Sequence, residues 1–181
     1  MGQPRDRCGS DRIFEHPFLS LRRDHFRGPT GTDEKLAYLI EIADWVNIVA
    51  FDASEQVLLV SQYRYGTRSV TLEIPGGAID AGETPLAAAR RELLEETGFE
   101  ADEWRQVGVV EPNPAIQGNR CTTFVARRLR RKAEFDADEI DQIGFIPLSE
   151  LRRKIREGEV QHALVIAAVH FALEALDGDG T

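Results

Sequence analysis

The stretch 77–99, which reads GAIDAGETPLAAARRELLEETGF, limits what this chain can fold into more than any other. Its centre is the run RELLEE from Arg91 to Glu96. Successive residues of an α-helix are about 100° apart, so Glu92 and Glu96 lie one turn apart on the same side, with Glu95 beside them. The sequence therefore predicts a helix that carries three carboxylates along one narrow edge.

Residues at both ends of this stretch favour the same helix. Thr84 is a good N-cap, Pro85 suits the first helical position, and Gly98 suits the C-terminal position that takes a left-handed conformation. Apolar residues fall on two other faces, which is typical of a helix held between packed layers. The acidic edge is therefore expected to face a cleft.

Three carboxylates on one helical edge repel one another, so a positive charge is expected beside them. Mg²⁺ and Mn²⁺ bind through a few carboxylates, water and substrate phosphates. We therefore assign Glu92, Glu95 and Glu96 as metal ligands. The turn-forming run Pro75-Gly76-Gly77 returns backbone groups toward the same edge, and the carbonyl of Gly76 is a candidate fourth ligand.

The same positions resemble a known family motif. The Nudix box reads G-x5-E-x7-R-E-U-x-E-E-x-G-U, where U is a bulky apolar residue, and every fixed position is filled here. The matching residues are Gly77, Glu83, Arg91, Glu92, Leu93, Glu95, Glu96, Gly98 and Phe99, of which Phe99 departs mildly from the usual aliphatic residue. The alternative is a solvated acidic helix held by arginine pairs.

The resemblance implies a hydrolase of phosphoric anhydride bonds, in which bound Mg²⁺ polarises the bond and activates water. Arg91 is expected to point away from the metal edge and to brace Glu83. The base is expected in the acidic segment 134–141, where similar pyrophosphatases place a glutamate; we choose Glu139, with Asp138 and Asp141 as rivals. Glu139, Glu83, Arg91 and Glu95 are thus the predicted catalytic residues.

The substrate class follows from residues outside the motif. The segments Gln62-Tyr63-Arg64 and 73–77, and a proline 16 residues past Gly98, resemble those of ADP-ribose and nucleotide-sugar pyrophosphatases. Candidate substrate contacts are Trp45, Arg64, Glu73, Pro114 and Asn119. Trp45 suits stacking on a base or core packing, and Arg64 suits a bidentate grip on phosphate. Glu73 suits ribose, a metal or an ion pair at a sheet edge.

Three functions remain open at this point. The favoured one is Mg²⁺-dependent hydrolysis of ADP-ribose or another nucleoside diphosphate sugar to a nucleoside monophosphate and a sugar phosphate. The second is hydrolysis of nucleoside triphosphates or dinucleoside polyphosphates. The third is a nucleotide-sugar sensor without activity, although such degenerate members usually lose a glutamate of the edge.

Composition narrows the class of protein. The 181 residues include 31 acidic and 22 basic ones, a balance that argues against a nucleic-acid partner. Cys8 and Cys121 are far apart, which argues against a disulfide scaffold or a zinc site. The four histidines, His16, His25, His162 and His170, show no ligand spacing and are interpreted as packing or surface residues. No apolar run approaches the ~20 residues of a membrane span, and no secretory signal is present, so we expect a cytoplasmic protein.

Periodicity predicts the domain plan and the fold class. Residues 1–15 are expected to be a flexible arm, and residues 16–176 a single domain. An antiparallel meander is predicted over 36–60, residues 70–75 are expected to lead into the loop before the acidic helix, and strands are predicted at 104–111, 122–129 and 143–146. Helices are predicted at 150–157, capped by Ser149, and at 160–176. The class is α+β, a Nudix-type α/β/α sandwich with a mixed central sheet and an N-terminal meander. In similar proteins N-terminal strands form a homodimer, the role expected for 16–43.

Overall fold

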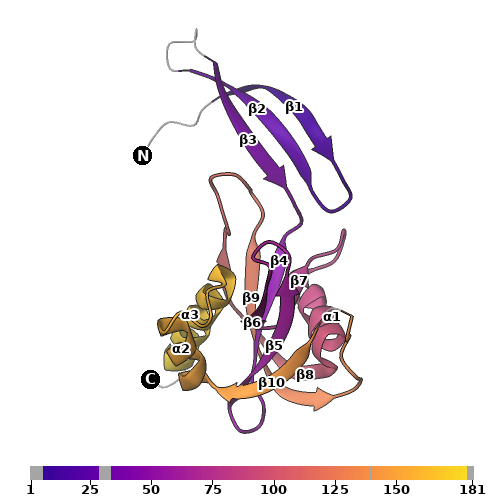
Figure 1. Ribbon diagram of the computed structural model, residues 1–181, viewed down its shortest axis with the longest axis vertical. Helices are drawn as coiled ribbons and strands as arrows, with labels where there is room; N and C mark the ends of the chain where they lie inside the picture. The colour runs from indigo at the N-terminus through magenta and orange to yellow at the C-terminus, as the bar shows by residue number, and fades with distance from the viewer. Residues whose placement is uncertain (1–5, 29–33, 139, 179–181) are drawn as a thin grey trace. The chain divides into compact units, whose positions relative to one another are not determined.

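The chain is divided into two compact units, which are described separately below (Figure 1). The structure is a computed structural model that describes residues 6–28, 34–138 and 140–178. The first unit comprises Met1–Ala43 and Glu111–Arg120, and the second comprises Asp44–Val110 and Cys121–Thr181. Within the described ranges, none of the helices has both the length and the apolar content needed to cross a bilayer.

The first unit is an antiparallel sheet of three strands in the order β1-β2-β3. The strands are β1 (Arg7–Glu15), β2 (Ser20–Arg27) and β3 (Glu34–Glu41). An N-terminal antiparallel meander is therefore present, as the predicted fold class includes, but it lies over β1, β2 and β3 and not over 36–60. Residues 7–15, however, form a strand instead of a flexible arm, because the charged residues of β1 pair with opposite charges on β2, as Asp11 does with Arg23 at 2.6 Å.

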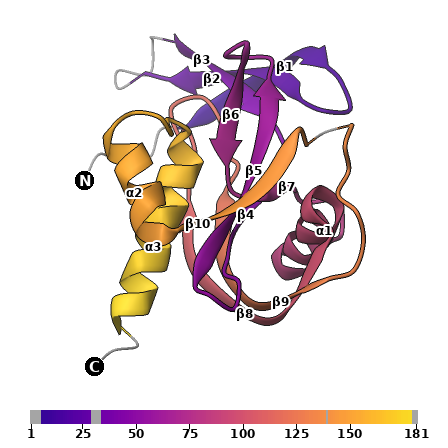
Figure 2. The ribbon, with the colours of Figure 1, turned by 60° about the horizontal axis from the view of Figure 1, so that its bottom comes forward.

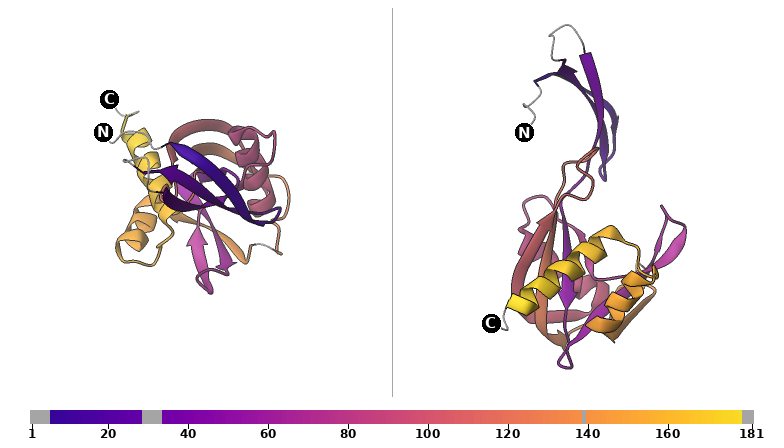
Figure 3. Two further views of the ribbon diagram at one scale, coloured as in Figure 1. Left: turned by 90° about the horizontal axis from the view of Figure 1, so that it is seen from above. Right: turned by 90° about the vertical axis from the view of Figure 1, so that its left-hand side faces the viewer.

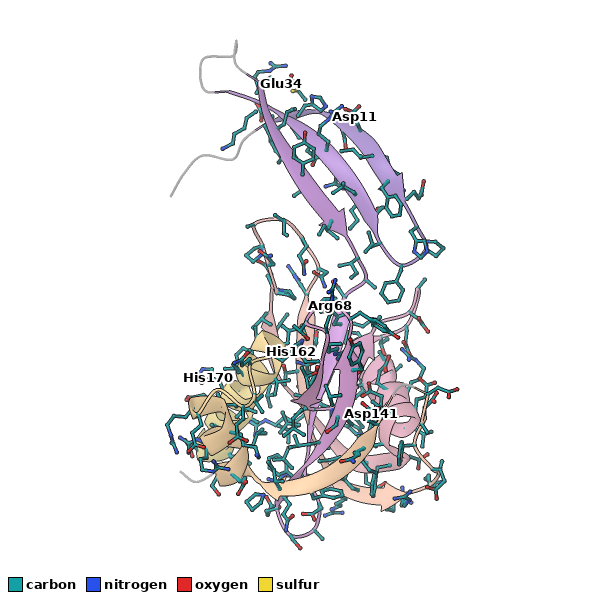
Figure 4. The ribbon with its side chains drawn as sticks, viewed as in Figure 1. Asp11, Glu34, Arg68, Asp141, His162 and His170 are labelled. Carbon is teal, nitrogen blue, oxygen red and sulfur yellow. The ribbon has the colours of Figure 1, made fainter. Side chains whose placement is uncertain are left out.

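A histidine links all three strands of this sheet. His25 on β2 contacts Asp11 of β1 through Nε2 at 2.8 Å and Glu34 of β3 through Nδ1 at 2.6 Å. Figure 4 labels the two acidic residues, one on each strand flanking β2. Hydrogen bonds that His25 donates to Asp11 and then to Glu34 raise the pKa of His25, while those from Arg23 and then His25 lower the pKa of Asp11.

We expect this link to make the first unit dependent on pH. A raised histidine pKa stabilises the sheet below the ordinary value of 6.5, and this contribution is lost as the pH rises through the folded pKa. The lowered Asp11 pKa contributes above 3.8 and is lost as the pH falls through its folded value. Hydrogen exchange of β2 amides, corrected for intrinsic rates, should therefore show more protection at pH 5.5 than at pH 8.5.

The variant His25→Gln is compared with the control His170→Gln. His170 is exposed and belongs to the second unit. His25→Gln should remove the difference in β2 protection between the two pH values, whereas His170→Gln should retain it. Equal protection of β2 at both pH values in the unmodified protein would contradict the prediction.

The second unit places two small sheets between helices. One sheet has the order β7-β4-β9-β8 and the other β10-β5-β6. Their strands are β4 (Trp45–Ala50), β5 (Gln56–Arg64), β6 (Ser69–Glu73), β7 (Gly76–Ala78), β8 (Phe99–Val110), β9 (Cys121–Arg131) and β10 (Gln142–Pro147). β4 runs parallel to β9 and antiparallel to β7, so the sheet is mixed, as predicted.

Helices cover both sides of these strands. α1 (Pro85–Thr97) lies on one side, and α2 (Leu148–Arg156) with α3 (Ala163–Gly178) on the other, as Figures 1 and 2 show. Side chains that alternate along β4 enter the two cores: Ile48 packs toward α1, and Val49 packs toward α3. The predicted α/β/α sandwich is confirmed, and β4, which is apolar except for Asn47, is packed on both faces.

Close packing fixes α3 against the sheet. Figure 3 shows α3 lying across β8 and β9. Phe171 of α3 approaches Gly108 of β8 so closely that a Cβ at Gly108 would lie 2.3 Å from the ring. A larger residue at this position would therefore push the helix away from the sheet.

Several predicted boundaries were wrong. The meander over 36–60 does not form, because β3 pairs with β2 while β4 pairs with β7 and β9. β8 begins at Phe99, directly after the helix. α2 begins at Leu148 after Pro147, without a cap from Ser149. α3 begins at Ala163, because Val160 is buried in the core ahead of the helix.

Candidate active site

The caps of α1 fix the position of the acidic edge. Thr84 Oγ1 accepts a hydrogen bond from the Ala87 amide at 3.2 Å, and Pro85 is the first helical residue. Gly98 ends the helix with φ 72°, and its amide donates to the Leu94 carbonyl at 2.8 Å. A side chain at Gly98 would also meet the Ala133 carbonyl at 2.1 Å, so glycine is required there for two reasons. The predicted caps are confirmed.

The two glycines of β7 lie directly against the acidic edge. Glu96 is 5% exposed, and its Oε2 accepts a hydrogen bond from the Gly76 amide at 2.9 Å. A Cβ at Gly77 would lie 2.5 Å from the Glu92 carboxyl group. The strand can pass this close to Glu92 only because Gly77 lacks a side chain, and a Cβ at Gly76 would lie 2.3 Å from the Val46 carbonyl.

Arg91 forms hydrogen bonds with three carboxylates, those of Glu83, Glu92 and Glu95. Its Nε and Nη2 donate to the two oxygens of Glu83 at 3.2 and 2.9 Å. Its Nη1 donates to Glu92 at 2.8 Å and to Glu95 at 3.1 Å, and Nη2 also donates to the Ala78 carbonyl at 2.9 Å. The expected brace to Glu83 is present, but Arg91 does not point away from the acidic edge.

These hydrogen bonds shift the pKa values of both Glu83 and Arg91. Hydrogen bonds from Arg91 lower the pKa of Glu83, and hydrogen bonds to Glu83 and then Glu92 raise the pKa of Arg91. Both groups therefore stay charged at neutral pH. The positive charge that three neighbouring carboxylates require is supplied, within the chain itself, by this guanidinium.

The donor types along this edge fit a hard divalent cation. Glu92, Glu95 and Glu96 offer carboxylate oxygens, which Mg²⁺ and Mn²⁺ prefer. Among the residues that the structure describes, however, no group of three or more His, Cys, Asp or Glu side chains is already gathered as a metal site. Cation binding would therefore require Glu92 and Glu95 to exchange their contacts with Arg91 for the ion.

The acidic segment 134–141 is attached to the end of α1. The Asp136 amide donates to the Glu95 carbonyl at 2.9 Å, which brings this segment beside the acidic edge. Glu139, the predicted base, lies outside the described residues. Of its rivals, Asp138 donates its amide to the Asp136 side chain at 2.9 Å, and Asp141, labelled in Figure 4, donates its amide to the Ser61 carbonyl at 2.8 Å. Both of these side chains are exposed.

The predicted substrate-binding residues lie in different parts of the structure. Arg64 and Glu73 form a bidentate ion pair between β5 and β6, with distances of 2.8 and 2.7 Å. The backbone of Trp45 pairs with Ala78, whose carbonyl holds Arg91, and the tryptophan is half-buried. Pro114 and Asn119 belong to the first unit, where Asn119 is buried and donates to the Ala43 carbonyl at 3.1 Å.

Sequence reasoning missed His162. Its Nδ1 lies 3.9 Å from Glu73 Oε2, and Figure 4 labels it beside the start of α3. Nothing in the spacing of the histidines indicates this contact, since His162 and Glu73 are far apart in the chain and meet only because α3 packs against the strands.

Comparisons with known proteins agree with this geometry. The NUDIX domain model matches residues 43–169. An ADP-ribose pyrophosphatase of Mycobacterium tuberculosis is 31% identical over 167 residues, which cover 88% of this chain and 79% of that protein. An ADP-sugar pyrophosphatase of Mus musculus is 35% identical over 130 residues, covering 64% of this chain and 57% of that one. The crystal structure of an ADP compounds hydrolase has a TM-score of 0.85 and 23% identity, covers 98% of this chain and 97% of its own, and so shows the shared fold.

Proposed function

Since the chain belongs to the Nudix family, we propose that it hydrolyses the pyrophosphate bond of a nucleoside diphosphate sugar, with ADP-ribose the first substrate to test. The products would be a nucleoside monophosphate and a sugar phosphate. This proposal rests mainly on the edge of α1, where Glu92 and Glu96 lie against the two glycines of β7. The name of the Mycobacterium tuberculosis relative supports the substrate class.

Mg²⁺, with Mn²⁺ as the alternative, is proposed as the cofactor, held by Glu92, Glu95 and Glu96 together with the Gly76 carbonyl. When bound, such an ion neutralises phosphate charge, polarises the bond to be cleaved and lowers the pKa of a coordinated water. The Gly76 amide holds Glu96 in place on this edge. Arg91 fixes Glu83 and lies between Glu92 and Glu95, so it keeps the carboxylates close together before substrate arrives.

Substrate contacts are proposed for side chains outside this edge. Arg64 is 41% exposed, and its guanidinium, which pairs with Glu73 in the free protein, is proposed to bind phosphate oxygens of the substrate. Trp45 is proposed to stack on the base, and Pro114 and Asn119 are proposed as further substrate contacts. The proton of the attacking water is proposed to pass to the segment 134–141, with Glu139 as the base and Asp138 and Asp141 as the rivals.

The proposal is tested with a panel of ADP-ribose, GDP-sugars, UDP-sugars, nucleoside triphosphates and dinucleoside polyphosphates. Turnover is measured with Mg²⁺, with Mn²⁺ and after removal of metal by EDTA. Product masses in ¹⁸O-water identify the phosphorus that is attacked. Preferred cleavage of triphosphates would contradict the substrate class, and stoichiometric binding of nucleotide sugars without cleavage would identify a sensor instead.

A homodimer built through the first unit is also proposed. Its three-stranded sheet leaves large apolar side chains exposed, namely Ile13, Phe14, Phe18, Leu36 and Tyr38. Apolar groups gathered on so small a unit are typical of a surface that another chain covers.

Replacement of two of these aromatic residues should disrupt the dimer. We expect light scattering to give twice the mass of one chain for the unmodified protein and a value close to one chain for Phe14→Ser/Phe18→Ser. Tyr65→Ser, which removes an exposed aromatic ring from the second unit, is the control and should stay dimeric. A monomeric unmodified protein would rule out the dimer.

A further inference from the structure

Glu73 is a buried carboxylate at the end of β6 with an arginine as its partner. It is 2% exposed, and it receives two hydrogen bonds from Arg64, one to each oxygen. Thr71 Oγ1 donates to Oε1 at 2.6 Å. Burial by itself raises the pKa of Glu73, but the hydrogen bonds from Arg64 and Thr71 outweigh it and lower the pKa overall. The carboxylate is therefore charged, and it depends on its donors.

His162 approaches the same carboxylate from another element. It immediately precedes α3, and its Nδ1 lies 3.9 Å from Glu73 Oε2, too far for a hydrogen bond. This nitrogen is buried and has no hydrogen-bond partner among the residues that the structure describes. Buried polar atoms without partners are rare in native proteins, so such an atom beside a charged carboxylate calls for an explanation.

Arg64 and Glu73 differ in their exposure to solvent. Arg64 is 41% exposed, so its guanidinium can turn outward to a ligand, whereas Glu73 cannot follow it. In the free protein Nε and Nη2 of Arg64 both donate hydrogen bonds to Glu73. If Arg64 turned to a phosphate, Oε1 would keep its bond from Thr71, but Oε2 would lose the donor Nη2. A buried charge left in this state is strongly unfavourable.

We propose that His162 is a positioning residue that takes over Oε2 of Glu73 when Arg64 turns to the diphosphate of the substrate. This inference rests on the proposed function, because it needs a diphosphate that engages Arg64. An Nδ1–H of the imidazole donates to the carboxylate after a shift that closes the 3.9 Å gap to hydrogen-bond distance. His162 stabilises the complex with substrate more than the free protein, where Nδ1 forms no hydrogen bond and the two groups interact only electrostatically across the 3.9 Å gap.

The test uses the full chain with Mg²⁺ and ADP-ribose, and it compares three substitutions. His162→Phe keeps a ring but removes the donor, and His162→Asn retains a donor close to the position of Nδ1. His170→Phe is the matched control, since His170 lies on α3 with its side chain exposed, as Figure 4 shows. His162→Phe should raise KM by about tenfold to a hundredfold with kcat little changed, the effect of one hydrogen bond to a charged group.

Four further results are expected. His162→Asn should recover most of the loss in KM, His170→Phe should behave as the unmodified protein, and the melting temperature of the free protein should be the same for all of them. In a Glu73→Gln background, His162→Phe should add no further rise in KM, because the charge that needs the donor is gone. The inference is overturned if His162→Phe leaves KM unchanged, or if it raises KM equally with Gln at position 73. Absence of turnover of any nucleotide sugar by the unmodified protein would instead overturn the proposed function, and the inference with it.

Discussion

Replacing Glu96 by Gln should lower kcat by about a hundredfold or more, while the protein keeps its fold. The carboxylate of Glu96 is proposed to hold the divalent cation, and an amide is a much weaker ligand for Mg²⁺ because it carries no charge. The substitution should not disturb packing, because the amide oxygen of Gln can still accept the hydrogen bond that the Gly76 amide donates at 2.9 Å. Initial rates with ADP-ribose at saturating Mg²⁺ measure the loss.

The control for Glu96→Gln is Glu174→Gln, which makes the same change at an exposed carboxylate of α3. It should leave kcat unchanged. Isothermal titration with Mn²⁺ gives a second readout that does not depend on turnover, and Glu96→Gln should bind the ion more weakly than either comparison protein. Near-normal turnover in Glu96→Gln would refute the assignment of this edge as the metal site.

Arg91→Ala should reduce both activity and stability. The guanidinium donates to five acceptor atoms on four residues in three different segments of the chain, and its side chain is 28% exposed. Its removal leaves the carboxylates of Glu83, Glu92 and Glu95 without their shared cation. We expect a loss of about 2–3 kcal/mol in the free energy of unfolding, below the value for a fully buried pair because the site is partly solvated. Urea unfolding without metal measures it.

Arg90→Ala is a strict control because it makes the same change one residue earlier, where the side chain is exposed. It should change the free energy of unfolding by no more than about 0.5 kcal/mol. Arg91→Lys should fall between the two variants, since an ammonium group keeps the charge but cannot form the fork to Glu83. Equal stability of Arg90→Ala and Arg91→Ala would show that Arg91 does not organise the edge.

The local features of the site were predictable because they depend on neighbours in the sequence. Thr84, Pro85 and Gly98 set the limits of α1, and helical spacing placed Glu92, Glu95 and Glu96 on one side. The contact of Arg91 with Glu92 and Glu95 was missed, although the residues are adjacent or one turn apart, because we considered Glu83 as its sole partner. Strand boundaries were less accurate, since a strand that is buried on both faces, such as β4, has no alternation to mark its partners.

By itself the sequence determined the family, the α/β/α class, and a capped helix with a clustered acidic edge, because these follow from residue type at fixed short spacing. Only the tertiary structure decided that the Gly76 amide donates to Glu96, that Arg64 is held by Glu73, and that His162 lies beside the same carboxylate. Such contacts join residues on separate elements. Their approach is fixed by how the sheets and helices pack, which no local pattern records.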